Sequence, residues 1–253
     1  NMRLTGVAVR APGLALDLGE AVLRWSPLGV LGGRLRVQEL TLRDIDLLAE
    51  AKEEPEEEEP EEGAALQLPQ VVLPVAIELE QALLERLSVR QEAGGPPFVV
   101  DRAALSAVLD AGRLELRELS LALPEPRLEA FAAGGAELTG DYPLDLSLRW
   151  SLSRAPALEL AGEGELRGDL ARLEAGHRLT GVAQAQLEAL LSDLLGDPRW
   201  EADLTLTRAD LPAVRADLPA ADVQGRLSTS GDLGEARVQG SLSGTAPDLP
   251  DFG

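Results

Sequence analysis

Few residues in this chain are of types that catalyse reactions or bind metals. His177 is the only histidine and the chain has no cysteine, so no second His or Cys completes a catalytic triad or a metal site. We expect His177, between Gly176 and Arg178, to be a strand residue that faces water or a carboxylate. The 44 Asp and Glu residues are spread along the chain, and none stands in an apolar stretch that would raise its pKa for acid–base catalysis. The sequence therefore predicts no enzyme, no metal site and no cofactor.

One glycine-containing run has the composition of a phosphate-binding loop. It consists of Gly162-Glu163-Gly164, followed by Gly168. Its spacing departs from the GxGxxG pattern, and no helix is predicted after it to complete an anion site. We interpret this run as a turn.

The charge balance argues against one class of partner. Lys and Arg total 23 against 44 acidic residues, a net charge of -21. Such a chain repels nucleic-acid phosphates and anionic lipid surfaces, so no nucleic-acid partner is expected. No apolar run reaches about 18 residues, so no membrane-spanning segment is predicted. The chain opens with Asn1-Met2-Arg3 and enters a strand pattern at once, so we expect it to be part of a longer protein.

The clearest structural element is the run from Tyr142 to Leu152. Its apolar residues alternate strictly with polar ones, which is typical of a strand with one buried and one wet face. Pro143 suits the first position of such a strand, because it cannot donate a hydrogen bond to a neighbouring strand. Variations on this pattern recur along the chain, giving roughly fifteen strands at the spacing typical of all-β proteins.

Two predicted strands are long, and their apolar phase slips by one residue. In residues 34–48 the phase slips after Val37 and again after Leu42; in residues 112–123 it slips at Arg117-Glu118. β-Bulges absorb such slips and bend the strand. Residues 103–109 fit either a strand or a short helix, and the leucine spacing in residues 187–195 predicts one short helix.

These features predict an all-β fold: an elongated, curled antiparallel sheet that forms an open hydrophobic groove (a β-taco), with one or two short helices at most. We expect residues 1–253 to form a single groove segment. Residues 50–64 interrupt it with a run of mostly Glu, which predicts a disordered acidic loop because like charges repel.

Three segments of the chain carry motifs that occur together, in this order, in one known family. They are Leu23, Trp25-Ser26-Pro27, Leu31-Gly32-Gly33, then Leu35, Val37, Leu40 and Leu42; Asp141-Tyr142-Pro143-Leu144 with Trp150; and Gly162-Glu163-Gly164-Glu165-Leu166 with Gly168-Asp169-Leu170. In these motifs the chain resembles the TamB family, the inner-membrane subunits of the translocation and assembly module, which is grouped with AsmA-like repeating β-groove proteins. The resemblance implies a segment of the bacterial periplasm, anchored in the inner membrane by a helix upstream of this chain. It also implies phospholipids as ligands and the outer-membrane barrel TamA as a partner, contacted through regions outside this chain.

Together the pattern and the resemblance lead to one hypothesis: the apolar strand faces conduct phospholipid acyl chains between the inner and outer membranes and so support outer-membrane biogenesis. The residues expected to line the groove share the apolar side of their strands: Leu23, Trp25, Leu35, Val37, Leu114, Leu116, Leu144, Leu146, Leu148, Trp150, Leu152, Leu158, Leu160, Leu204 and Leu206. Two alternatives remain. The leucine stripes could be an ordinary core, and the chain could be a scaffold or chaperone that assembles outer-membrane proteins by β-strand augmentation.

Overall fold

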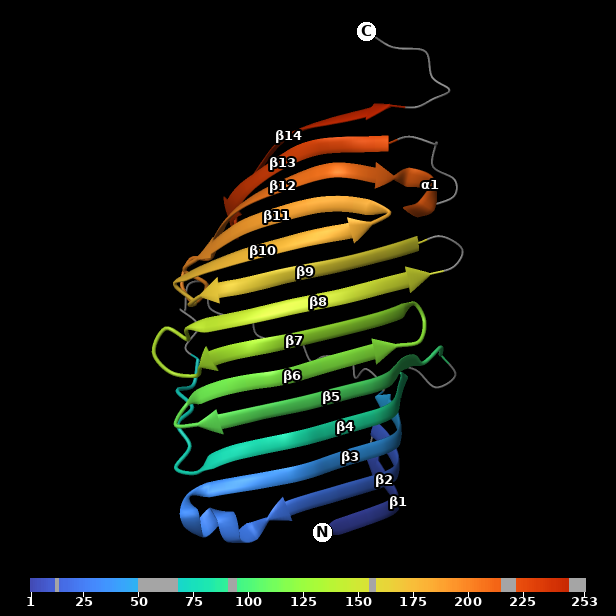
Figure 1. Ribbon diagram of the computed structural model, residues 1–253, viewed down its shortest axis with the longest axis vertical. Helices are drawn as coiled ribbons and strands as arrows, with labels where there is room; N and C mark the ends of the chain where they lie inside the picture. The colour runs from blue at the N-terminus through green and yellow to red at the C-terminus, as the bar shows by residue number, and fades with distance from the viewer. Residues whose placement is uncertain (12–13, 50–67, 91–94, 155–157, 215–221, 246–253) are drawn as a thin grey trace. The chain divides into compact units, whose positions relative to one another are not determined.

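The computed structural model describes residues 1–11, 14–49, 68–90, 95–154, 158–214 and 222–245 (Figure 1). Strands dominate the described residues. Their bounds are β1 (Met2–Ala11), β2 (Leu14–Ser26), β3 (Arg34–Ala49), β4 (Ala76–Arg90), β5 (Phe98–Asp110), β6 (Arg113–Leu123), β7 (Arg127–Glu137), β8 (Leu144–Arg154), β9 (Leu158–Gly168), β10 (Arg172–Gly181), β11 (Ala183–Ser192), β12 (Arg199–Asp210), β13 (Asp222–Asp232) and β14 (Ala236–Thr245). A 3-10 helix, η1 (Pro27–Gly32), and a single helical turn, α1 (Leu211–Val214), are the helices of the described part.

The strands follow one another in the sheet in the order of the chain, and the sheet does not close into a barrel. The predicted all-β fold with an open sheet and two short helices is therefore confirmed. The chain divides into two compact units, with β1–β7 in the first and β8–β14 in the second.

In the first unit, one strand pair departs from the expected antiparallel arrangement. β3 and β4 are parallel, with Leu35 beside Ile77 and Leu47 beside Val89. A parallel pair needs a crossover connection, and residues 50–75 supply it. The predicted acidic loop at residues 50–64 lies in this connection, outside the described residues.

The predicted phase slips are present in the first unit. Between β2 and β3 the register shifts at Arg24 and Trp25, opposite the first slip, and Asp44 at the second slip has a positive φ of 54°. Between β6 and β7 the register shifts between Leu116 and Leu119, at the predicted slip. Each irregularity returns the leucines to the same face, so the apolar side stays continuous along a bent strand.

In the second unit, the predicted helix at residues 187–195 is wrong. Residues 183–192 form strand β11, whose Leu187 pairs with His177 of β10 and with Leu204 of β12. Leu187, Ala189 and Leu191 alternate as a strand requires, while Leu190 lies on the opposite face. Pairing on both sides therefore overrides the helical spacing of the leucines. Residues 103–109, left open between helix and strand, belong to strand β5.

Candidate functional site

The second unit carries an apolar face that is continuous from strand to strand. Directly paired residues of neighbouring strands lie on the same side of a sheet, and here most of the paired residues are apolar or glycine. Leu146 pairs with Leu166, which pairs with Ala175. The series continues through Ala189 and Ala202.

Nine of the predicted groove residues lie on this apolar face. They are Leu144, Leu146, Leu148, Trp150 and Leu152 on β8, Leu158 and Leu160 on β9, and Leu204 and Leu206 on β12. Alternation along β8, together with its pairing to β9, places the first seven on one side. The pairings through β10 and β11 place the two β12 leucines on the same side.

The other six predicted residues share an apolar face in the first unit. Trp25 pairs with Val37, which lies beside Leu79 of β4. Leu79 pairs with Ala107, and Ala107 with Leu116. The same pairings place Leu23, Leu35 and Leu114 on this side of the unit.

Bulky side chains of the second unit lie over glycines of the neighbouring strand. A Cβ added to Gly162 would lie 2.5 Å from Trp150 Nε1, and one added to Gly231 would lie 2.9 Å from Trp200 Cζ2. Leu242 covers Gly225 in the same way, with Cδ2 2.7 Å from the added Cβ. Glycine thus provides space for the large side chain of the paired residue, as in other sheets where aromatic rings cover glycine.

His177 is a strand residue, as predicted, but it lies on the apolar face and its ring contacts an aromatic side chain in place of a carboxylate. It pairs with Gly164 and Leu187, both on the apolar face. Its imidazole stacks on Trp150, with ring centroids 6.0 Å apart and an interplanar angle of 7°, within the range of favourable aromatic pairs. Trp150 and His177 come from β8 and β10 and meet across β9.

The glycines of residues 162–164 explain how these two rings can meet. They lie inside strand β9, so the interpretation of the run as a turn is wrong. A Cβ at Gly162 would lie 2.6 Å from His177 Nε2, and one at Gly164 would lie 2.6 Å from His177 Nδ1. The two glycines make room for the aromatic pair and hold no phosphate-binding loop.

The opposite face of each unit is polar. In the second unit, Arg167 lies 3.3 Å from Asp145 and Arg178 lies 3.5 Å from Glu163, across neighbouring strands. These pairs are exposed and each adds little stability. Their consequence is a wet surface opposite the apolar one.

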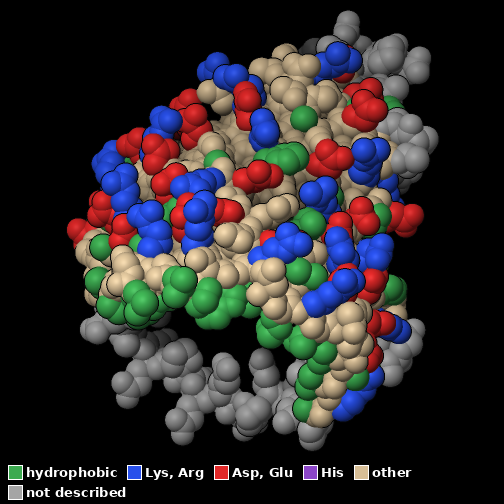
Figure 2. All heavy atoms as spheres, turned by 60° about the horizontal axis from the view of Figure 1, so that its bottom comes forward, with side chains coloured by type: hydrophobic (Ala, Val, Ile, Leu, Met, Phe, Trp, Pro, Cys, Tyr) green, Lys and Arg blue, Asp and Glu red, His purple; other side chains and the backbone are tan. Residues whose placement is uncertain are grey.

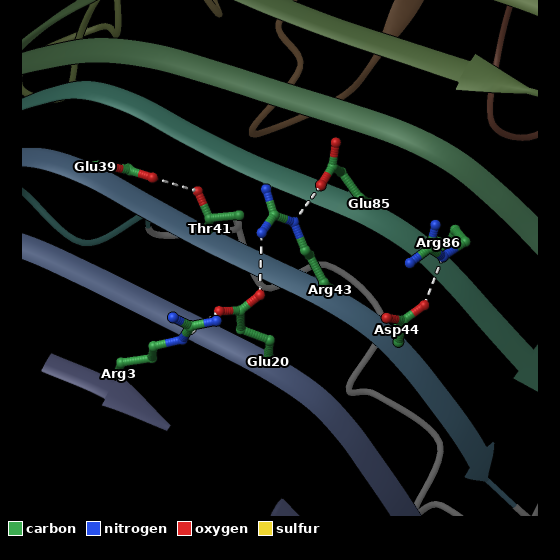
Figure 3. Close-up of polar contacts among 8 residues, drawn as sticks. All are labelled: Arg3, Glu20, Glu39, Thr41, Arg43, Asp44, Glu85 and Arg86. Carbon is green, nitrogen blue, oxygen red and sulfur yellow. Dashed lines mark hydrogen bonds and ion pairs between the residues drawn. The ribbon is translucent and has the colours of Figure 1, made fainter. Parts of the chain in front are cut away.

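In the first unit the polar face carries a ladder of ion pairs across β1 to β4 (Figure 3). Arg3 contacts Glu20 at 2.6 Å, Glu20 accepts a hydrogen bond of 3.0 Å from Arg43, and Arg43 donates one of 2.5 Å to Glu85. The hydrogen bond from Arg43 lowers the pKa of Glu85 below its ordinary value. A second pair, Arg86 with Asp44 at 2.5 Å, lowers the pKa of Asp44 in the same way.

Thr41 lies beside this ladder (Figure 3) and is the one buried polar residue among the described residues. Its hydroxyl donates to Glu39 Oε1 at 3.1 Å. Thr41 lies between Val22 and Leu83 on the polar side of the sheet. Long Arg and Glu side chains that lie across a sheet shield such small residues with their methylene groups.

The apolar faces, in contrast, are open to a large extent. Among the described residues, the buried hydrophobic side chains are Ala76, Val100, Leu173 and Ala209. Leu148 is 43% exposed and Leu227 is 41% exposed, whereas core leucines are nearly inaccessible. In Figure 2, charged side chains cover the face turned to the viewer, and hydrophobic side chains gather along its lower rim.

The first unit also has a shallow apolar depression of about 210 Å³ on its strands β3 to β6. Its lining includes Leu40, Leu42, Leu84, Leu105 and Leu119. These leucines were not among the predicted groove residues, although each lies close to a predicted or observed phase slip. The slips were the signal that could have assigned them to the apolar side.

The described residues contain no cluster of three or more His, Asp or Glu side chains able to hold a metal ion. Among the helices described, none has the length and apolar content needed to cross a membrane. Each of the two units presents an extended sheet with one apolar face and one charged face. These features define the class of repeating, groove-type β-sheet proteins.

Residues 63–252 match the family described as TamB, N-terminal domain. The chain therefore belongs to the TamB family. No curated protein and no solved structure matches it. TamB proteins are transport and assembly proteins of the periplasm, anchored in the inner membrane and associated with TamA.

Proposed function

We propose that this chain conducts phospholipids by their acyl chains along the apolar faces of its sheet, between the inner and outer membranes. The observation that carries the proposal is the row of apolar residues and glycines that pair across β8–β14, interrupted by His177 and Thr229, with mostly polar and charged residues opposite them. Acyl chains would lie on the apolar side while headgroups remain in water. Membership of the TamB family supports a transport or assembly role.

The partial exposure of the apolar face supports lipid binding over an ordinary core. Leu148 and Leu166, on neighbouring strands, are 43% and 37% exposed. Burial of one methylene is worth about 0.8 kcal/mol, so a 16-carbon chain gains on the order of 10 kcal/mol on a dry apolar surface. A surface that repeats from strand to strand lets the chain move on without one dominant site.

A photoreactive residue placed on either side of β8 tests this proposal. At position 146 it should crosslink to lipid in cells, and at position 147, on the polar side, it should not. Lipid extracted from the crosslinked protein is identified by mass spectrometry. Equal labelling at the two positions would contradict the proposal.

A charge on the same face should block passage. Leu148→Arg places a guanidinium among apolar side chains, where an unpaired charge is costly. Lipid crosslinking at position 146 should fall several-fold in this variant, and Ser147→Arg, on the polar face, serves as the matched control. No difference between the two variants would favour an ordinary core.

A scaffold role in autotransporter or outer-membrane protein assembly is the second candidate. It is supported by β1 and β14, each of which has a neighbouring strand on one side only among the described residues. Such an edge can pair with a strand of a client protein. A proline at Val238 in the middle of β14 would then abolish crosslinks to client proteins while lipid crosslinking at position 146 persists.

A further inference from the structure

The connection between β2 and β3 presents the most exposed apolar side chains among the described residues of the first unit. It contains η1 (Pro27–Gly32), in which no residue is buried. Leu28 is 77% exposed and Leu31 is 88% exposed, while Val30 and Trp25 are each 42% exposed. Figure 1 shows this connection at the end of the β2–β3 hairpin.

The connection holds a fixed conformation. The Gly33 amide donates to the Val30 carbonyl at 3.0 Å, and the Ala76 amide donates to the Gly33 carbonyl at 2.9 Å. Gly33 adopts the left-handed conformation, with φ of 75°, which favours glycine. The two leucines therefore project from a defined turn tied to β4.

The charge around this turn differs from that of the chain as a whole. Residues 24–38 contain Arg24, Arg34 and Arg36 and no acidic residue, in a chain with net charge -21. Arg24 pairs with Glu39 at 3.1 Å, and Arg36 pairs with Glu78 and Glu80. Arg34 forms no ion pair within the described residues, so the turn carries a free cation.

We propose that this turn, defined by Trp25, Leu28, Val30, Leu31 and Arg34, docks into the headgroup region of an anionic lipid bilayer. Leucine side chains inserted at the interface gain hydrophobic free energy, tryptophan favours the headgroup level, and arginine attracts lipid phosphate. The anionic membrane surface repels the acidic remainder of the chain. Its electric field therefore orients the protein with this turn toward the membrane.

A bilayer fits this turn better than a second copy of the chain does. A stable protein interface buries about 800 Å² on each partner, more than a six-residue turn with two projecting leucines provides. A bilayer needs only a few inserted side chains together with charge attraction. Trp25 also lies on the apolar face of the first unit, so the docking turn is continuous with that face. The docking itself does not depend on lipid conduction.

Flotation of the purified full chain with vesicles tests the proposal. Vesicles of phosphatidylethanolamine with phosphatidylglycerol should bind the chain, and vesicles of phosphatidylcholine alone should bind it less. Leu28→Asp with Leu31→Asp should lower binding to the anionic vesicles by about tenfold or more. Arg34→Glu should weaken binding to anionic vesicles and leave the residual binding to phosphatidylcholine unchanged.

The control is Leu233→Asp in the turn between β13 and β14. Leu233 is 83% exposed but stands beside Asp232 and close to Glu235, so it should not dock and its substitution should leave vesicle binding unchanged. Far-UV circular dichroism confirms that each variant is folded. Three results would each overturn the proposal. The wild-type chain does not bind the anionic vesicles; Leu233→Asp loses as much binding as Leu28→Asp with Leu31→Asp; or the latter variant keeps its vesicle binding and loses self-association.

Discussion

Replacing Gly162 by alanine should destabilise the second unit, although alanine normally stabilises a strand relative to glycine. Alanine in an ordinary strand interior gains about 0.5–1 kcal/mol because glycine loses more conformational entropy on folding. At Gly162 the added Cβ would lie 2.5 Å from Trp150 Nε1 and 2.6 Å from His177 Nε2. Both rings must move, and the aromatic stack across β9 must open.

The magnitude follows from these two opposing effects. Inserting one methyl group into a tightly packed place costs about 1–3 kcal/mol, and loss of the stacked pair adds about 0.5–1.5 kcal/mol. Set against the entropic gain, Gly162→Ala should lower the free energy of unfolding by about 1–3 kcal/mol. Near-UV circular dichroism should report the changed surroundings of Trp150.

Gly176→Ala is the matched control for this substitution. Gly176 lies on β10 beside His177, and a Cβ there would meet nothing within 4 Å. It should leave stability unchanged or raise it by a few tenths of a kcal/mol, below the full entropic gain of about 0.5–1 kcal/mol. Urea unfolding followed by circular dichroism measures both variants.

A background that carries both His177→Ala and Trp150→Ala separates the ring clash from other causes. Adding His177→Ala and Trp150→Ala removes the rings above residue 162, so alanine at this position should then be neutral or stabilising. A destabilisation of Gly162→Ala that persists without the rings would refute the reasoning. So would a single variant that is as stable as the wild type.

Two further predictions concern charge. Because Arg43 donates to Glu85, the folded pKa of Glu85 lies below its ordinary value of 4.5, so its stabilising effect is complete above pH 4.5 and is lost as the pH falls through the lower folded pKa. Glu85→Gln should therefore flatten the decline of the unfolding temperature below pH 4.5, and Glu159→Gln, outside any ion pair of the described residues, should not. His177→Arg, which adds a permanent charge to the apolar face, should lower lipid crosslinking at position 146 several-fold relative to Thr180→Arg on the polar face; equal crosslinking in the two variants would contradict lipid passage at His177.

The sheet could be predicted from the sequence because alternation is a local property. In residues 144–152 each apolar residue is two positions from the next, and any pairing partner leaves that side apolar. Even the slips at Val37 and Leu42 could be located, since a change of phase is visible in one strand alone. The parallel pairing of β3 with β4 could not, because it depends on the path of the connection between them.

The error at residues 187–195 has a related physical cause. Leu187, Leu190, Leu191, Leu194 and Leu195 have helical spacing, but a helix there would leave β10 and β12 without the strand between them. Pairing of β11 on both sides satisfies two rows of backbone groups. Only the neighbouring strands carry that information, and they are distant in the sequence.

His177 was misplaced for a different reason, since its strand did contain the signal. Leu173, Ala175, His177 and Leu179 are spaced by two, and Arg172, Glu174, Arg178 and Thr180 occupy the alternate positions. Its immediate neighbours, Gly176 and Arg178, suggested a wet position. In a strand the residues two positions away decide the face, and here they are apolar.

The aromatic pair also bears on how a lipid-conducting surface would work. A lone Trp150 standing on a flat sheet would project above the leucines and obstruct a chain moving past it. Over Gly162 its indole lies where a Cβ would otherwise stand, and His177 lies over Gly162 and Gly164 in the same way. Trp200 over Gly231 and Leu242 over Gly225 repeat the arrangement. Large side chains placed over glycines keep the height of the surface even across strands of unequal composition. An acyl chain that moves along the sheet must leave each position as readily as it enters, and this requires an even surface. The glycines of β9 and β13 therefore matter to the proposed function as much as the leucines do.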